Sequence, residues 1–287
     1  MRALRWIVIV LGLLFSGLPL VWMGLSSIKQ RADAISQHPR WIPAAEAPVA
    51  PDSPRFEATT SAFRDLASVH AGAQASFWEH LLNSAIIGFF STLATVALGT
   101  LCAYGFSRFR VPGEKDWLFF VLSTRFMPPL AVVVPVLLMY RAFDLQGTRL
   151  GLVVLYTVFN LSLAVWLMKG FLDEIPRAFE EAAVVDGYTR FGALVRVVLP
   201  EARTGIAVTA VFCLISAWNE YGFAMTLNSS GAVTVPAYFA GLQGNIEGMP
   251  WPQVAAGALV FVAPIVAFTV LVRSHLLRGV TFGTVKQ

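Results

Sequence analysis

Six apolar stretches, each about 20 residues long, constrain this chain of 287 residues more than any other feature. A helix needs about 20 mostly apolar residues to cross the hydrocarbon core of a bilayer, and a spanning segment must satisfy its own backbone hydrogen bonds. Charged residues make up only 13% of the chain, against about 25% in soluble domains. The sequence therefore predicts an all-α integral membrane protein with six transmembrane helices. The stretches lie at 6–25, 84–106, 118–140, 150–167, 205–227 and 254–272.

Two of these stretches need comment. The third carries Pro128, Pro129 and Pro135, and we expect it to be kinked or broken because proline lacks the N–H of a helical hydrogen bond. The first could be a cleaved signal peptide, because Arg2 and Arg5 precede it. Its apolar length exceeds the usual roughly 7–15 residues and no clean Ala-x-Ala site follows. We therefore expect a retained helix.

Lysine and arginine residues predict the orientation of the spans. With the N-terminus in the cytoplasm, most of them fall on the cytoplasmic side, as the positive-inside rule requires. Both termini then lie in the cytoplasm, and the chain forms one domain, residues 1–287, without an internal repeat. Its parts are a core at about 80–275, an outer loop at about 26–83, an inner loop at about 168–204 and a tail at 273–287. Within the outer loop we expect a helix in 61–80.

The inner loop has the pattern of two short helices joined by a turn. Pro176 suits the first turn of a helix, which we expect over 177–185. Asp186-Gly187 is a turn signal, and a second short helix is expected over about 188–198. Together they would form a compact projection from the membrane.

The side chains of the first short helix suggest a docking surface. Ala182 and Ala183 lack bulk, so another backbone can approach closely, and Glu181 can present a carboxylate to a cationic group. Alternatively, Glu181 merely pairs with Arg177 at i,i+4, which is worth about 0.3–0.5 kcal/mol. That energy is too small to explain the pattern. One face of this helix carries Ala178, Ala182 and Val185, while Glu180 and Glu181 lie off that stripe.

The spacing within this loop resembles the EAA signature of ABC importer inner-membrane permeases, in the maltose-type carbohydrate-uptake branch. Val197 is a mild departure, because the family favours isoleucine there. The stretch 49–80 has no match. The residues that match the signature are Glu181, Ala182, Ala183, Asp186, Gly187, Leu199 and Pro200, and further resemblance lies in 28–33, 41–43, 83–84, 103–109, 218–220 and 278–286.

This resemblance implies a permease subunit that imports a carbohydrate or polyol. Its partners would be two ATP-binding subunits, a second and different permease, and a periplasmic or lipid-anchored solute-binding protein. The loop at 176–199 would dock on an ATPase, with the seven signature residues as coupling contacts. The chain would be a multi-pass protein of the bacterial cytoplasmic (inner) membrane, in contact with lipid.

The residues agree with an energy source outside this chain. A P-loop needs a Gly-Lys pair, which the sequence lacks. We expect no enzymatic activity and no cofactor here, and expect ATP and Mg to bind the partner ATPase. An ion-coupled carrier, and a non-transporting scaffold or receptor, are alternatives. The carrier is less favoured because Glu220 is the only clear intramembrane acid and carriers usually contain repeats.

The candidate substrate or gating residues are polar groups inside apolar stretches. Arg125 could line or gate a pathway, snorkel towards the inner surface, or pair with Glu220. Asn219 and Glu220 could bond solute hydroxyls or bridge helices. Tyr221 could stack on a sugar ring or anchor the chain at an interface.

Other regions carry weaker indications. The tail candidates for ATPase contact are Arg278, Gly279, Thr281 and Lys286, with a frayed terminus as the alternative. The loop at 228–252 either meets the binding protein or simply connects two spans. Cys102 and Cys213 lie in apolar runs without a Cys/His cluster, so we expect no metal site. The net charge of +4 is explained by topology, and we expect no nucleic-acid binding.

Overall fold

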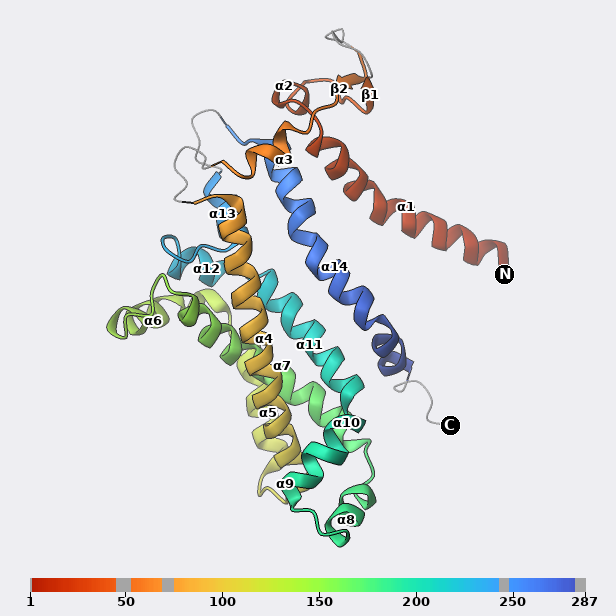
Figure 1. The fold of residues 1–287 in the computed structure, drawn as a ribbon, viewed down its shortest axis with the longest axis vertical. Helices are drawn as coiled ribbons and strands as arrows, with labels where there is room; N and C mark the ends of the chain where they lie inside the picture. The colour runs from red at the N-terminus through yellow and green to blue at the C-terminus, as the bar shows by residue number, and fades with distance from the viewer. Residues whose placement is uncertain (1, 45–52, 69–74, 243–247, 282–287) are drawn as a thin grey trace. The chain divides into compact units, whose positions relative to one another are not determined.

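The computed structural model describes residues 2–44, 53–68, 75–242 and 248–281 and is built almost entirely of helices (Figure 1). The chain separates into two units. One comprises Met1–Leu81 and Tyr238–Pro264, and the other comprises Leu82–Ala237 and Ile265–Gln287. Each unit is described by itself.

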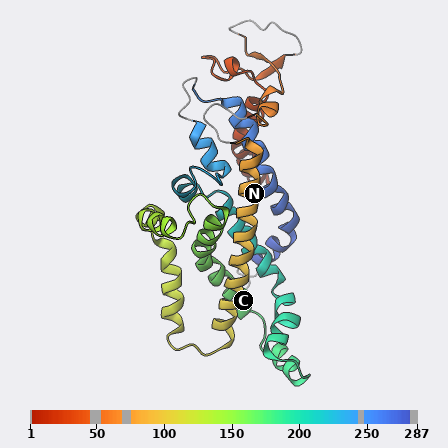
Figure 2. The ribbon, with the colours of Figure 1, turned by 60° about the vertical axis from the view of Figure 1, so that its left-hand side comes forward.

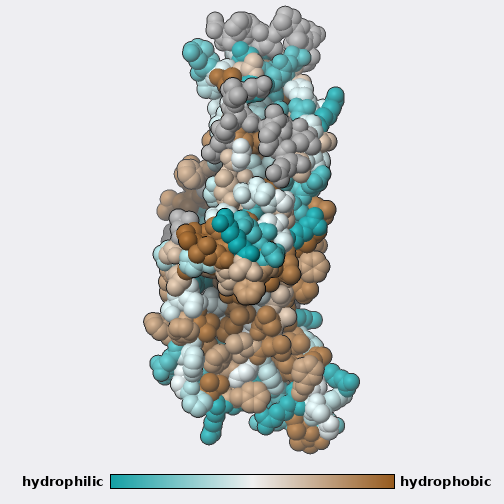
Figure 3. Space-filling model, turned by 90° about the vertical axis from the view of Figure 1, so that its left-hand side faces the viewer, coloured by the Kyte–Doolittle hydropathy of each residue, from teal (hydrophilic) through white to brown (hydrophobic). Residues whose placement is uncertain are grey.

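Four helices are long and apolar enough to cross a membrane. The predicted stretches at 6–25, 84–106, 150–167 and 254–272 are helical, and each helix extends beyond its predicted ends. Hydrophobic side chains cover a large part of the face shown in Figure 3, as expected where lipid replaces water. The four helices are α1 (Arg2–Ser27), α4 (Phe77–Arg108), α7 (Arg149–Asp173) and α14 (Trp251–Thr281).

The third predicted stretch is broken, as its prolines indicated. Helix α5 (Glu114–Ser123) runs into a 3-10 turn, η1 (Thr124–Phe126), and α6 (Pro129–Ala142) begins after two extended residues. The two halves are bent by 91°, and Figure 2 shows α6 turning away from α5. The break lies where Pro128 and Pro129 cannot donate backbone hydrogen bonds.

The fifth predicted stretch, 205–227, is wrong as a single helix. Helix α11 (Arg203–Trp218) ends before Asn219, and α12 (Gly222–Leu227) is a separate short helix. A second bend of 75° separates α11 from the segment Arg190–Glu201. By length and composition, the described residues contain four spans, or up to six if each bent pair is one span.

The first unit contains a small subdomain around a buried lysine, called here the outer subdomain after the side on which the sequence predicts it. Helix α2 (Arg31–Ala34) follows α1, and strands β1 (Ile42–Ala44) and β2 (Arg55–Glu57) pair in parallel. The outer helix predicted in 61–80 is shorter than expected, because α3 spans only Ser61–Asp65 and α4 begins at Phe77.

Lys29 organises this subdomain. Its side chain is buried, and its Nζ lies 3.9 Å from the ring centroid of Trp22 and 5.2 Å from that of Phe56. Trp22 in turn packs on Trp41 with a centroid distance of 4.4 Å. Burial lowers the pKa of Lys29 below its ordinary value, and nearby Asp33 opposes this shift. Cation–π contacts therefore hold a charge where water is excluded.

The second unit packs α4, α7 and α11 closely. A Cβ placed on Gly99 of α4 would lie 2.6 Å from the Cβ of Ala164 on α7, so only glycine permits this approach. One buried cluster joins Tyr140, Leu152, Leu155 and Leu227. Helix α13 (Val235–Gly241) begins where its Val235 N–H donates to Ser84 Oγ at 2.9 Å. This packing fixes the frame that carries the sites below.

Candidate functional site

Residues 178–201 of the predicted inner loop form a helix–turn–helix segment at one end of the second unit (Figure 1), called here the coupling segment after its predicted role. Helix α8 (Ala178–Val185) lies within one residue of its predicted range. Gly187 then adopts φ +91°, a left-handed conformation that favours glycine. Thr189 caps α9 (Arg190–Ala193) by accepting the Gly192 N–H at 3.0 Å. Sequence-local turn and cap residues therefore determine the shape of this segment.

The second half of the segment packs against the long helices. After α9 the chain winds as a π-helix, η2 (Leu194–Val198), and continues as α10 (Leu199–Glu201). Leu194 and Val198 are buried in a cluster with Tyr104 of α4 and Leu172 of α7, and Leu199 packs on its edge. Pro200 is exposed. The segment is thus seated on two candidate spans.

The outward face of the segment, called here the coupling surface, consists of exposed side chains. Val185 is 86% exposed and Phe191 is 69% exposed. Large apolar side chains that are exposed beside charged ones favour an interaction site. The predicted stripe residues Ala178, Ala182 and Val185 all belong to it, as do Glu181, Asp186 and Gly187, while Ala183 is buried.

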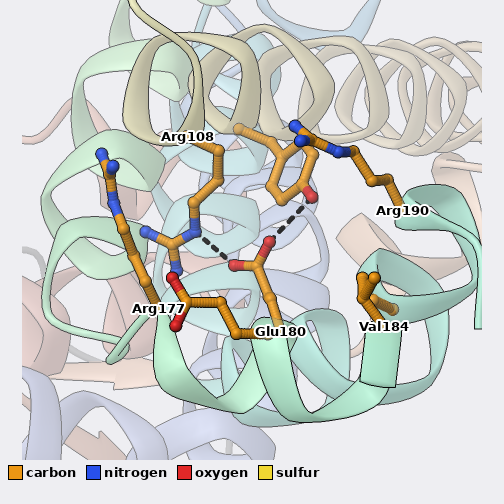
Figure 4. Close-up of a pocket in the computed structure, with 8 residues that line it drawn as sticks. Arg108, Arg177, Glu180, Val184 and Arg190 are labelled. Carbon is orange, nitrogen blue, oxygen red and sulfur yellow. Dashed lines mark hydrogen bonds and ion pairs between the residues drawn. The ribbon is translucent and has the colours of Figure 1, made fainter. Parts of the chain in front are cut away.

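Glu180 ties α8 to the end of α4. Its carboxylate forms an ion pair with Arg108 and accepts a 2.9 Å hydrogen bond from the Tyr104 hydroxyl. Figure 4 shows Glu180 pointing toward Arg108, with Arg177 and Arg190 beside them. The side chains of Arg108 and Glu180 are only 7% and 14% exposed, so this pair is shielded from solvent screening.

The Arg177–Glu181 pairing considered from sequence does not form. Arg177 instead donates to the Ser107 carbonyl oxygen at 2.8 Å, and Glu181 is exposed. Sequence reasoning missed Glu180. One signal was available, because Tyr104 and Arg108 lie one helical turn apart and present a hydroxyl and a cation on one face of α4.

The contact of Glu180 with Arg108 and Tyr104, called here the Glu180 anchor, continues through polar side chains into two further helices. Ser107 Oγ donates to Asp173 of α7 at 2.6 Å. Lys169 Nζ lies 2.7 Å from Asp173 and 3.1 Å from Glu114 of α5. The coupling segment is therefore connected through side chains to α4, α7 and α5. A cavity of about 390 Å³ beside the anchor is lined by Tyr104, Arg108, Arg177, Glu180, Glu181, Val184, Arg190 and Ala193.

The candidate residues within apolar stretches divide into two groups. Arg125 and Glu220 line one cavity of about 220 Å³. Asn219 and Tyr221 are exposed and do not line it. Asn219 Nδ2 bonds its own helix, at the Ile215 carbonyl oxygen.

The pairing of Arg125 with Glu220 considered from sequence is not observed among the described residues. Arg125 Nη1 lies 3.3 Å from both the Phe159 carbonyl oxygen and Asn160 Oδ1. Glu220 accepts the Tyr156 hydroxyl at 2.7 Å and the Phe223 N–H at 2.8 Å. Glu220 therefore bridges α7 and α12.

The tail candidates are described only in part. Arg278, Gly279 and Thr281 fall within α14, but their side chains lie outside the described residues, as does all of Lys286. Within the part of the chain that the structure describes, no group of three His, Cys, Asp or Glu side chains could hold a metal ion.

Long apolar helices, and a helical segment with exposed apolar side chains at one end, are features of a membrane-embedded subunit. Residues 95–280 match the family described as binding-protein-dependent transport system inner membrane component, and the chain belongs to this family. It is a permease subunit of an ABC importer and a multi-pass inner-membrane protein, in a class whose ATPase activity resides in partner chains.

Individual relatives agree with this assignment. A probable ABC transporter permease protein of Sinorhizobium fredii is 30% identical over 283 residues, covering 99% of this chain and 94% of that protein. The trehalose transport system permease protein of Mycobacterium tuberculosis is 34% identical over 212 residues, covering 73% of this chain and 77% of that protein. A bacterial ABC transporter that imports the acidic polysaccharide alginate shares the fold, with a TM-score of 0.71, 21% identity and 95% coverage of both chains.

Proposed function

We propose that this permease imports a carbohydrate or polyol, driven by ATP hydrolysis in partner subunits. The observation that carries the solute class is the 34% identity to a trehalose permease. A sulfoquinovosyl glycerol permease of Agrobacterium fabrum, 29% identical over 96% of this chain, supports it. The importer would comprise two ATP-binding subunits that bind ATP and Mg, a second and different permease, and a periplasmic or lipid-anchored solute-binding protein.

The proposed topology has six spans with both termini in the cytoplasm. The bent pair formed by α5 with η1 and by α6 then counts as one span, and α11 with α12 forms the fifth span. The coupling segment, Arg190–Glu201 included, lies on the cytoplasmic side. The excess of Lys and Arg on that side supports this orientation. The tail residues Arg278, Gly279, Thr281 and Lys286 would contact the ATPase.

The coupling surface would seat in the ATPase. Glu181, Ala182, Asp186 and Gly187 are exposed on it, whereas Ala183, Leu199 and Pro200 would hold its backbone in place. Closure of the ATPase dimer on ATP would move this segment as a rigid body and switch the permease between outward-open and inward-open states. The ion pair of Glu180 with Arg108 would carry that motion to α4.

The test is coupling in the reconstituted importer. We expect Glu181→Lys or Gly187→Asp to weaken ATPase docking, or to leave ATP hydrolysis running without solute uptake. The first variant inverts an exposed charge and the second places a side chain at φ +91°. Glu201→Lys, an exposed charge change on α10, is the matched control. Normal uptake by both variants at normal membrane abundance would contradict the coupling role.

A further inference from the structure

We infer that the cavity beside Arg125, here called the Arg125 cavity, is a solute subsite of this permease that binds the hydroxyl groups of a neutral sugar ring. This inference rests on the proposed carbohydrate import and adds the residues that would make the contact. The cavity is formed within the second unit by η1, α6, α7, α11 and α12. Its lining residues include Arg125, Tyr156, Phe159, Asn160, Ser216 and Glu220.

Two interrupted helices meet at this cavity. The η1–α6 break contributes Met127 and Pro129, and the α11–α12 break contributes Glu220. Because Pro129 has no N–H, the carbonyl oxygen of Arg125 loses its α-helical donor, while that of Thr124 accepts the Met127 N–H at 3.4 Å. Non-helical backbone in a membrane protein is tolerated where it is buried in protein or lines a watery cavity.

Arg125 supplies donors that the protein does not use. Only its Nη1 has acceptors among the described residues, the Phe159 carbonyl oxygen and Asn160 Oδ1, both at the long distance of 3.3 Å. A guanidinium carries five N–H donors, and its Nε and Nη2 have no acceptor within the described part of the chain. Asn160 is 4% exposed and contributes an amide to the same wall, and Ser216 contributes a hydroxyl.

Glu220 determines the class of solute. Its carboxylate is held by three donors, the Tyr156 hydroxyl and the N–H groups of Phe223 and Ala224. It therefore stays in the cavity as a fixed acceptor, and its formal charge cancels that of Arg125. A neutral group with several hydroxyls can use both the donors and the acceptor, whereas an anionic substituent would gain no net attraction, because the carboxylate offsets the guanidinium.

The walls and the size suit part of a sugar. Phe159 and Phe223 pack together with ring centroids 4.8 Å apart, and both line the cavity. Aromatic walls with a few polar groups are typical of ligand sites. The volume of about 220 Å³ is below the roughly 300–1,000 Å³ of complete ligand pockets. The cavity would hold one ring, and the second permease would hold the rest of the solute.

The experiment uses the complete importer with its binding protein in proteoliposomes. Three radiolabelled probes are offered: trehalose, diacetylchitobiose and sulfoquinovosyl glycerol. The readout is sugar imported per ATP hydrolysed, at saturating loaded binding protein. We expect import of a neutral probe, and we expect Arg125→Gln and Asn160→Ala to lower this ratio about tenfold, since one lost net hydrogen bond is worth roughly that factor. ATPase stimulation by the binding protein should persist, because the coupling surface is intact.

The matched control is Arg141→Gln, the same change at a residue that bonds Gln146 and does not line the cavity. The inference is overturned if Asn160→Ala leaves the ratio unchanged while Arg125→Gln either leaves it unchanged or misfolds. It is also overturned if Arg141→Gln lowers the ratio as much as the cavity variants do. Import of only the sulfonated probe would overturn the neutral-sugar assignment while leaving carbohydrate import standing. If the wild type imports no sugar, the proposed function fails and this inference fails with it.

Discussion

Glu180 lies in a different environment from its neighbour Glu181 in the coupling segment. Glu181 beside it is exposed, whereas Glu180 is enclosed by Arg108 and Tyr104. Removing one partner of an enclosed ion pair leaves a charge without compensation, which costs about 3–5 kcal/mol. In the proposed mechanism, this destabilisation weakens the contact that holds α8 to α4.

We therefore predict that Glu180→Gln and Arg108→Gln each abolish both sugar uptake and the stimulation of ATPase activity by the binding protein. The double exchange Glu180→Arg with Arg108→Glu should restore part of both activities, because it restores the ion pair. Glu201→Gln, an exposed acid on α10, is the control. Double-exchange protein with no more activity than the single variants, at equal membrane abundance, would contradict a role for the pair.

Lys29 gives the outer subdomain a pH dependence with a definite sign. Its pKa is lowered in the fold, so between that value and the ordinary one, about 10.4, the unfolded segment binds a proton that the folded segment has released. The free energy of unfolding should therefore rise with pH across this window and level off above it. Hydrogen exchange of peptides in 28–44, corrected for intrinsic rates, measures this directly.

Lys29→Met should remove the slope, because methionine does not titrate. Lys115→Met, an exposed lysine of α5, should keep it despite the same change in net charge. A slope that survives in Lys29→Met would mean that another group is responsible.

At the scale of elements, the contact between α4 and α7 depends on a missing side chain. Because a Cβ on Gly99 would lie 2.6 Å from Ala164, Gly99→Ala must push the two helices apart. We predict a destabilisation of about 1–3 kcal/mol, measured as a lower thermal midpoint of the detergent-solubilised protein. Gly105→Ala on the same helix has no atom within 4 Å of the new Cβ and should be neutral or slightly stabilising. Equal thermal midpoints for the two variants would show that α4 and α7 can accommodate the added methyl group, which would contradict the prediction.

The elements also show where sequence patterns are sufficient. Apolar length alone located the four long helices, and prolines located the break after η1, because both properties act locally. The break after Trp218 was missed because Asn219-Glu220-Tyr221 contains no proline within an apolar run. It arises from Glu220, whose carboxylate caps α12 while holding Tyr156 of α7. That interaction depends on a helix 64 residues away.

In the molecule as a whole, the sites show the same difference between features set by neighbouring residues and features set by distant ones. The position of the coupling segment followed from local turn and cap residues, including Gly187 and Thr189. The contact of Glu180 with Arg108 was missed because the two residues are 72 positions apart, and the facing pair Tyr104 and Arg108 does not by itself name the acid that it binds. The same holds for the Arg125 cavity, where residues from η1, α6, α7, α11 and α12 meet. Family membership identifies the class of transporter, whereas the proposed solute contacts depend on residues that are far apart in the sequence and close in the fold.

Because of the π-helical turn Leu194–Val198, the direction in which the coupling segment presents its side chains depends on the number of residues in that turn. Such a turn accommodates one residue more than an α-helical turn. Deleting one residue there would restore α-helical winding and rotate everything before it by about 100° about the helix axis. The same side chains would then face a different direction, and Val185 and Phe191 would no longer meet the same partner. A permease with this loop one residue shorter would thus need an ATPase with a differently oriented cleft, even if every contact residue were unchanged.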